Sequence, residues 1–211
     1  MKVLFFTPTI PRRQADKWFS PVRMKQAAVM DVDHRIFDGS TPVLSNAYQA
    51  AYEYALTNGY DWVLCVEDDE EPEPNIVGEF LEVTSQWPED GLFMGSKRLR
   101  EVNVYVPAVW VFRVNPPPVN AKPVSVRQIR PNECGPFPII GGTICTPLFY
   151  SPKWMQRHGL EFHGHRRYGA KDILNWDSAL GDDLFNKRLR FIACPAIHIN
   201  YWDEKTRRVY S

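Results

Sequence analysis

The acidic run at residues 67–71 is the part of the chain best suited to chemistry. It reads Glu-Asp-Asp-Glu-Glu and directly follows the apolar segment 63–66, which is typical of a buried strand. Adjacent carboxylates repel one another unless a cation or water compensates their charge. Their oxygens suit Mg²⁺ or Mn²⁺, and ligands of open α/β sheets bind beyond the carboxyl ends of the strands. We interpret the run as a divalent-metal site for a phosphorylated substrate. The alternative is a solvated turn before a helix that begins near Pro74.

Polar groups also follow other apolar segments of the chain. Pro8-Thr9-Ile10-Pro11-Arg12 comes after the first segment and Asp38-Gly39-Ser40 after the second. Further along, Gly181-Asp182-Asp183 is followed by His198 on the last apolar segment. Three of these features have simpler alternatives: a plain turn at Asp38, helix N-terminal acids that interact with the dipole at Asp182-Asp183, and a hydrogen-bonded core histidine at His198.

The elements that must position these groups alternate between strand and helix. Short apolar strands are expected at residues 2–6, 34–37, 61–66 and 91–95, and helices at 22–30, 43–57 and 75–87. The helix at 43–57 is the best defined, because small and apolar residues recur at helical spacing and Asn58-Gly59 ends it. This βαβαβαβ order predicts an α/β fold with a mostly parallel sheet and helices on its faces.

The second half of the chain has a different character. Residues 102–114 are typical of one strand, and residues 115–138 carry seven prolines, which indicates an irregular excursion. An apolar, glycine-containing pattern resumes at 139–149, a short helix is expected at 152–158, and 158–168 is a basic, histidine-rich loop. A helix at 176–189 and a final strand at 191–199 complete the expected elements.

The order of these polar groups resembles that of nucleotide-sugar-dependent glycosyltransferases of the GT-A fold, particularly the inverting enzymes of glycosyltransferase family 2. Those enzymes open with a strand and a Pro-Thr-x-x-Arg turn, place Asp-Gly-Ser after the second strand, and carry an acidic Asp-x-Asp metal motif after the third. A later Glu-Asp motif heads a helix and is often followed by a histidine. The resemblance covers roughly residues 3–198. It implies a Rossmann-like, mostly parallel central sheet with a smaller C-terminal acceptor-side region.

The resemblance also implies one catalytic domain over residues 1–211, with a nucleotide-sugar-binding half at 1–100 and an acceptor-side half at 101–211. In the first half it places the donor against Thr7, Pro8, Thr9, Arg12, Asp38, Asn46, Glu67 and Asp68, with Asp38 at the nucleobase edge. The same resemblance makes Asp69 a metal ligand, with Glu67 beside it or bonded through water and His198 completing the shell.

On the acceptor side, the resemblance makes Asp182 the general base that deprotonates the acceptor hydroxyl, with Asp183 in reserve. The acceptor and the sugar would be bordered by Gly141, Gly142, Thr143 and Trp176. Three departures from the family pattern are visible. Glu67 replaces the first aspartate of the metal motif, the later motif is Asp-Asp, and Arg190-Phe191 stands where a glycine often follows the helix. The Gln-x-x-Arg-Trp signature of processive synthases is absent, so we expect transfer of a single sugar.

Composition limits the possible partners and the compartment. The net charge is zero, which argues against stable nucleic-acid binding through a bulk basic field. Basic residues near Arg98 and at 163–167 keep a modified nucleobase in DNA among the possible acceptors, beside a saccharide or a protein. Cys65 and Cys194 lie in apolar segments, as small buried residues do, and the cysteine spacing fits no metal motif, so we expect a reduced, cytoplasmic protein. No apolar segment approaches the length of about 18 residues that a membrane span needs.

The sequence thus predicts a metal-dependent glycosyltransferase that moves one sugar from a nucleotide-sugar, most simply a UDP-sugar, to a hydroxyl with inversion, using Mn²⁺ or Mg²⁺. Two alternatives stay open. A nucleotidyltransferase shares the nucleotide-binding half, but it usually carries a glycine-rich loop after the first strand, and residues 7–13 contain no glycine. A non-catalytic nucleotide- or sugar-binding module would not need acids in both halves of the chain.

Overall fold

The structure is a computed structural model of the 211-residue chain. It describes residues 1–9, 33–38, 45–67, 70–99, 104–106, 108–111, 125–128, 136–140, 144, 146–163, 165–166, 173–174 and 176–201. The predicted helix at 22–30 lies outside this set.

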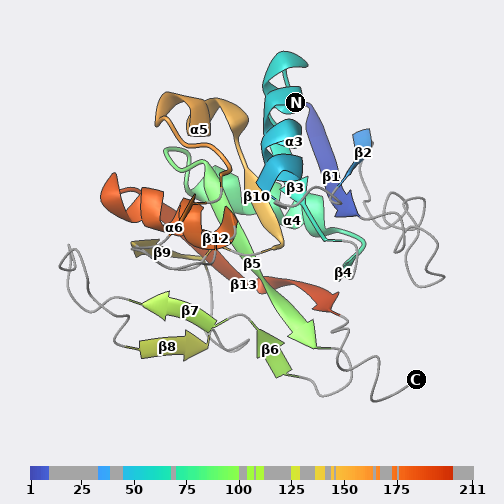
Figure 1. Ribbon diagram of the computed structural model, residues 1–211. Coiled ribbons are helices and arrows are strands. Elements are labelled where there is room, and N and C mark those ends of the chain that lie inside the picture. The colour runs from blue at the N-terminus through green and yellow to red at the C-terminus, as the bar shows by residue number, and fades with distance from the viewer. Residues whose placement is uncertain are drawn as a thin grey trace.

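A nine-stranded sheet organises the molecule, with the strand order β2-β1-β3-β10-β5-β13-β4 and with β6 and β9 paired to β5 and β13 (Figure 1). Five strands run in one direction: β1 (Val3–Thr9), β2 (Asp33–Asp38), β3 (Trp62–Cys65), β5 (Leu92–Leu99) and β13 (Arg190–Tyr201). The opposite direction is taken by β4 (Glu70–Pro72), β6 (Val104–Val106), β9 (Phe137–Ile140) and β10 (Leu148–Tyr150). The expected mostly parallel sheet is therefore confirmed.

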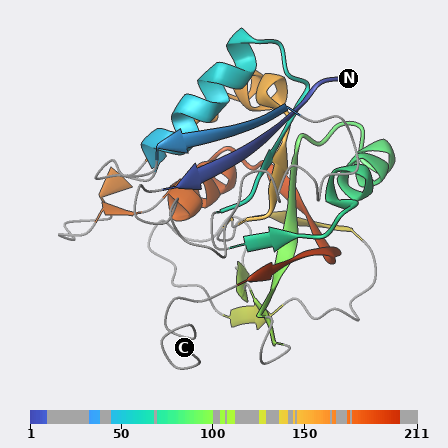
Figure 2. The ribbon, with the colours of Figure 1, turned by 90° about the vertical axis from the view of Figure 1, so that its right-hand side faces the viewer.

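Helices cover both faces of this sheet. One face carries α3 (Ser45–Thr57), α5 (Pro152–Arg157) and α6 (Trp176–Asn186), and the other carries α4 (Ile76–Gln86), as Figure 2 shows. Side chains alternate across a strand, so Leu4 and Phe6 of β1 pack in the first layer, while Val3 and Phe5 pack in the second. The predicted α/β architecture with helices on both faces is confirmed.

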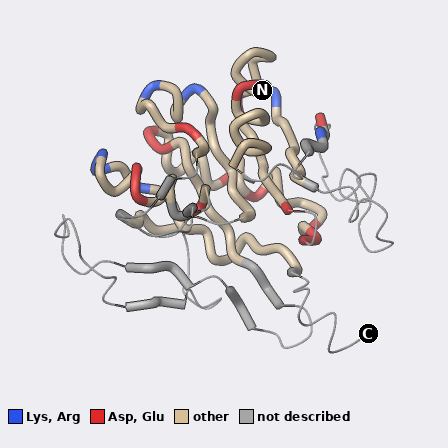
Figure 3. The backbone as a smooth tube through the Cα atoms, viewed as in Figure 1, with Lys and Arg blue, Asp and Glu red and all other residues tan. Residues whose placement is uncertain are grey.

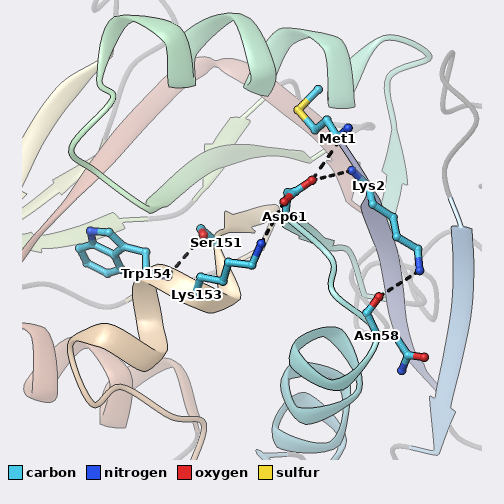
Figure 4. Close-up of polar contacts among 7 residues, drawn as sticks. All are labelled: Met1, Lys2, Asn58, Asp61, Ser151, Lys153 and Trp154. Atoms are coloured by element: carbon cyan, nitrogen blue, oxygen red, sulfur yellow. Dashed lines mark hydrogen bonds and ion pairs between the residues drawn. The ribbon is translucent and has the colours of Figure 1, made fainter.

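The amino ends of β1, β3 and α5 are tied together at Asp61 (Figure 4). The Asp61 carboxylate accepts a hydrogen bond from the Lys2 backbone N–H at 2.9 Å and another from the Lys153 Nζ at 3.3 Å. Ser151 caps α5 by accepting a hydrogen bond from the Trp154 N–H at 3.3 Å. These contacts fix one edge of the sheet, and the carboxyl ends of the parallel strands lie at the other.

Strand β13 changes partners along its length. Residues 190–193 pair with β9, and the register against β5 then shifts between Ala193 and His198. Beyond that irregularity β13 pairs with β4, where Glu70 lies opposite Tyr201 and Pro72 opposite Ile199. The sequence did not predict β4, because glutamate and proline are depleted in strands; pairing with β13 imposes the extended conformation.

Other predictions in the second half were wrong in detail. Where one strand was expected at 102–114, the described residues form two strands in different sheets, since β6 pairs with β5 and β7 (Ala108–Val111) pairs with β8 (Ser125–Gln128). Strand β8 lies within the expected irregular excursion. Within the expected basic loop, β11 (His165–Arg166) pairs with β12 (Ile173–Leu174). These short strands depend on pairing partners that local composition does not reveal.

Helix α6 ends in a left-handed residue that is not glycine. Arg188 has a φ of 55°, its N–H donates to the Phe185 carbonyl at 3.0 Å, and the Leu189 N–H donates to the Leu184 carbonyl at 2.8 Å. This pattern is the Schellman arrangement that usually places glycine at the left-handed position. Arg188 therefore occupies the left-handed position at the end of α6 where glycine is common. Among the described helices, none is long and apolar enough to cross a membrane.

Candidate functional site

The parallel register brings three of the predicted polar groups to one edge of the sheet. Thr9 of β1 lies opposite Asp38 of β2, and the Val66 N–H, just after β3, donates to the Phe6 carbonyl at 3.1 Å. Thr7 and Pro8 are buried at the end of β1. The carboxyl ends of β1, β2 and β3 therefore gather residues 7–9, Asp38 and Glu67 at the edge where ligands of such sheets bind.

Glu67 begins the acidic run and is held from two sides. Its half-buried carboxylate accepts a hydrogen bond from the Tyr48 hydroxyl at 3.0 Å, and its backbone N–H donates to Glu70 Oε2 at 2.7 Å. The Glu70 side chain also accepts a hydrogen bond from the Thr146 hydroxyl, and Glu70 is only 3% exposed. Figure 3 shows acidic positions close to one another in the region of β4. The run is thus anchored to the sheet interior at Glu70.

Tyr48 connects the acidic run to helix α6. Burial, followed by the nearby Cys65 and Glu67, raises the pKa of the Tyr48 hydroxyl well above its ordinary value, so Tyr48 stays a neutral donor. Its ring stacks on Trp176, the first residue of α6, with centroids 4.1 Å apart. Trp176, expected beside the acceptor, is 3% exposed and packs in the core with Tyr48 and Phe162.

The start of α6 therefore lies next to the acidic run, and its acid is Asp177. Asp177 is half-buried in the first turn of the helix, and its carbonyl accepts a hydrogen bond from the Ile144 N–H at 3.3 Å. The sequence did not point to Asp177, because Asp182-Asp183 resembles the later acidic motif of the family. The helix expected at 176–189 begins at Trp176 as predicted, and the helical spacing of the buried residues Trp176, Leu180 and Leu184 is the signal that could have placed Asp177 in its first turn.

Asp182 and Asp183 lie in the second half of α6, so the alternative that they are N-terminal helix acids is wrong. A helix rises about 1.5 Å per residue, which places them about 7.5 and 9 Å beyond Asp177 along the axis. Both side chains are half-buried, and Asp183 Oδ2 lies 2.7 Å from His163 Nε2. Their proposed roles as base and reserve base stay predictions.

His198 lies on β13 beside Glu73. Its Nε2 is 3.6 Å from Glu73 Oε1, and its Nδ1 is 3.2 Å from the Ala196 carbonyl oxygen. Asn200, two residues later, is opposite Glu71, the last residue of the acidic run, so His198 is about 7 Å along the strand from that end of the run. Its role as a metal ligand stays a prediction.

Of the remaining predicted site residues, the structure describes Asn46. Asn46 is exposed in the first turn of α3. Other predicted site residues lie outside the described residues: Arg12, Asp68, Asp69, Gly141, Gly142 and Thr143. In the part of the chain that the structure describes, no group of three or more His, Cys, Asp or Glu residues could hold a metal ion. The oxygen-rich chemistry of residues 67–71 still fits Mg²⁺ or Mn²⁺.

Comparisons with known proteins identify the fold. No protein-family model and no curated protein sequence matches this chain. Among solved structures, A197 from STIV is similar at 13% identity with a TM-score of 0.58, covering 97% of this chain and 87% of that chain. S. aureus TarS 1–349 is similar at 10% identity and a TM-score of 0.54, covering 95% of this chain and 60% of that chain.

A third similar structure is CMP:2-keto-3-deoxy-manno-octonic acid synthetase complexed with CTP, at 11% identity and a TM-score of 0.52, covering 100% of this chain and 98% of that chain. TarS 1–349 in complex with UDP is similar at a TM-score of 0.51. The chain therefore has a GT-A-like fold, the fold of nucleotide-sugar glycosyltransferases and related nucleotidyltransferases.

Proposed function

We propose that this protein is a metal-dependent glycosyltransferase that moves one sugar from a UDP-sugar to a hydroxyl acceptor with inversion. The observation that carries the proposal is the register that gathers residues 7–9, Asp38 and Glu67 at one sheet edge, next to the start of α6. The similar structure of TarS with bound UDP supports a uridine nucleotide as the donor. The acceptor is a hydroxyl of a saccharide, a protein or a modified nucleobase.

The donor side of the site has to bind a nucleotide and tolerate a charged leaving group. Asp38 would accept hydrogen bonds from the nucleobase edge, because a carboxylate is an acceptor only. Glu67 and Asp69 would hold Mn²⁺ or Mg²⁺, with Asp68 close to the nucleotide and His198 as a further ligand. When bound, such an ion stabilises the negative charge that develops on the departing diphosphate.

The acceptor side needs a carboxylate that takes the hydroxyl proton as the new bond forms. We propose Asp177 for this role, because it lies in the turn of α6 whose first residue stacks on the same Tyr48 that binds Glu67. Asp182 and Asp183 are the residues that the sequence favours. Only one of the three acids can deprotonate a given acceptor hydroxyl, because the three lie at different positions along and around the helix.

Thermal unfolding with UDP, GDP and CDP, each with and without Mn²⁺, tests the proposal. A nucleotide at about 100 times its Kd stabilises the folded state by about 2.7 kcal/mol, which raises Tm by about 5–10 °C in a chain of this size. We expect this shift for UDP with Mn²⁺, and its loss with a chelator. No shift with any of the three nucleotides would refute the proposal.

Variants of the donor side separate metal binding from base recognition. Asp69→Asn should abolish UDP release from UDP-sugars in the presence of Mn²⁺, whereas Asp38→Ala should raise KM for the donor and leave measurable turnover. Full activity in both variants would contradict the site assignment. Mn²⁺ without nucleotide is the control for nonspecific stabilisation.

A nucleotidyltransferase is the second candidate, because CMP:2-keto-3-deoxy-manno-octonic acid synthetase matches over 98% of its own length. Such an enzyme would join a nucleoside triphosphate to a sugar and release diphosphate. Residues 7–13 lack the expected glycine-rich loop. Diphosphate release from CTP or UTP with a free sugar, without UDP release from UDP-sugars, would favour this candidate.

A further inference from the structure

We propose that Tyr48 and Glu70 are positioning residues that hold Glu67 in the orientation needed to bind the metal ion and the donor diphosphate. The inference rests on the proposed function, because it names the support of that same site. Neither residue needs to touch the donor, since each acts through a hydrogen bond to Glu67.

Tyr48 fixes the carboxylate of Glu67. Its hydroxyl donates to Glu67 Oε1 at 3.0 Å from a fully buried ring. The ring is wedged among aromatic neighbours, with Phe6 at 5.1 Å, Trp176 at 4.1 Å and Phe162 at 5.5 Å between centroids. A side chain packed in this way has few rotamers available, so the donated hydrogen bond selects one orientation of the carboxylate. Hydrogen bonds to a charged acceptor are also stronger than neutral ones.

Glu70 fixes the backbone of Glu67. Its Oε2 accepts from the Glu67 N–H at 2.7 Å, and the Glu70 N–H donates back to the Glu67 carbonyl at 3.1 Å. Its Oε1 accepts from the Thr146 hydroxyl, two residues before β10 in the centre of the sheet. A buried carboxylate is costly unless its oxygens are hydrogen-bonded. Glu70 meets that requirement by binding the first residue of the acidic run to the sheet interior.

Tyr48 also joins the two halves of the proposed site. Its hydroxyl donates a hydrogen bond to Glu67, and the face of its ring stacks on Trp176 at the start of α6. Displacement of either contact would therefore move the acidic run relative to Asp177. This geometry makes Tyr48 a common support for the donor side and the acceptor side.

Tyr48→Phe tests the inference, because it deletes one hydroxyl and keeps the ring. Tyr52→Phe is the matched control: Tyr52 is one helical turn later on α3 and also contacts Phe162. Loss of a group that orients a metal ligand typically weakens metal affinity about 10–100-fold. Calorimetry of UDP binding at a series of Mn²⁺ concentrations should show a weakening of that size for Tyr48→Phe and less than about twofold for Tyr52→Phe.

Glu70→Gln is the second variant, because glutamine keeps the size of the side chain and one acceptor for the Glu67 N–H. Its amide nitrogen then faces the Thr146 hydroxyl, which can rotate to accept. We expect a smaller loss of Mn²⁺-dependent UDP binding than in Tyr48→Phe, and a larger loss in Thr146→Val combined with Glu70→Gln. Circular dichroism and thermal unfolding confirm that each variant folds.

Three outcomes are distinguishable. Weakened binding in Tyr48→Phe and Glu70→Gln, with Tyr52→Phe unchanged, supports the inference. Loss of binding in Glu67→Gln together with unchanged binding in both Tyr48→Phe and Glu70→Gln overturns the inference and leaves the proposed function in place. Unchanged binding in Glu67→Gln, or no Mn²⁺-dependent nucleotide binding by the unaltered protein, overturns the proposed site and the inference with it.

Discussion

Exchange of Asp177 for asparagine distinguishes among the acids of α6 as the general base. Asp182 lies five residues later, which places it about 7.5 Å along the helix axis and about 140° around it from Asp177. A general base must come within about 2.6–3.2 Å of the proton that it takes. The two carboxylates therefore cannot serve the same hydroxyl, and one substitution should dominate.

We expect Asp177→Asn to lower kcat by about 10²–10⁴, the usual contribution of general base catalysis. This loss corresponds to about 3–5 kcal/mol of transition-state stabilisation at about 1.4 kcal/mol per tenfold. Asparagine keeps the size and the helical position of the side chain, so KM for the donor and Mn²⁺-dependent UDP binding should stay within about twofold.

The assay is release of UDP from a panel of UDP-sugars with water as the acceptor, because a base activates water as it activates a hydroxyl. Asp182→Asn and Asp183→Asn are the matched variants on the same helix, and each should keep most of the activity. A large loss of kcat in Asp182→Asn with normal turnover in Asp177→Asn would refute the assignment from the structure and support the one from the sequence.

Three further predictions concern stability. The hydrogen bond from the Lys2 backbone N–H, together with Lys153, lowers the pKa of Asp61; its stabilising contribution is therefore present above about pH 4 and lost as pH falls through the lowered value. Asp61→Asn should thus reduce the fall in unfolding free energy between pH 6 and pH 3, measured by urea titration. An equal fall in Asp61→Asn and in the exposed control Glu89→Gln would contradict this prediction. Arg188→Gly should stabilise the protein by about 0.5–1 kcal/mol in urea unfolding, because it relieves the left-handed conformation, and a destabilised variant would count against that strain. Arg190→Ala should cost about 1–3 kcal/mol, because it strands the 6% exposed Asp90 carboxylate that Arg190 binds at 2.9 and 2.8 Å; a cost below about 0.5 kcal/mol by the same titration would show that solvent replaces the pair.

The first half of the fold could be predicted from the sequence because its signals are local. The helix expected at 43–57 is α3 (Ser45–Thr57), ended by Asn58 and by Gly59 at a φ of 68° as the pattern indicates. The apolar segment before the acidic run is β3, which is parallel to β1, and β1 is parallel to β2. Because β2, β1 and β3 are parallel neighbours, residues 7–9, Asp38 and Glu67 meet at their carboxyl ends.

The rest depended on contacts between distant segments. Strand β4 is Glu-Glu-Pro and becomes a strand only because β13 pairs with it. Helix α6 contains Gly181-Asp182-Asp183, which locally is typical of a turn, yet burial of Leu180 and Leu184 carries the helix through it. The helix expected at 176–189 does begin at Trp176, so Asp177, and not Asp182, is the acid of its first turn. The support of Glu67 by Tyr48 and Glu70 joins residues from separate elements, so no spacing in the sequence could reveal it.

The change of partners along β13 divides the longest strand into two regions that can diverge independently. Residues 191–193 are fully buried, and substitutions there would disturb the whole domain. Residues 199–201 belong with β4 and the acidic run, and the irregular stretch between them absorbs small displacements without transmitting them to the interior. Selection for a new donor or a new acceptor could therefore change residues 199–201, beside the acidic run, while the rest of the domain keeps its stability.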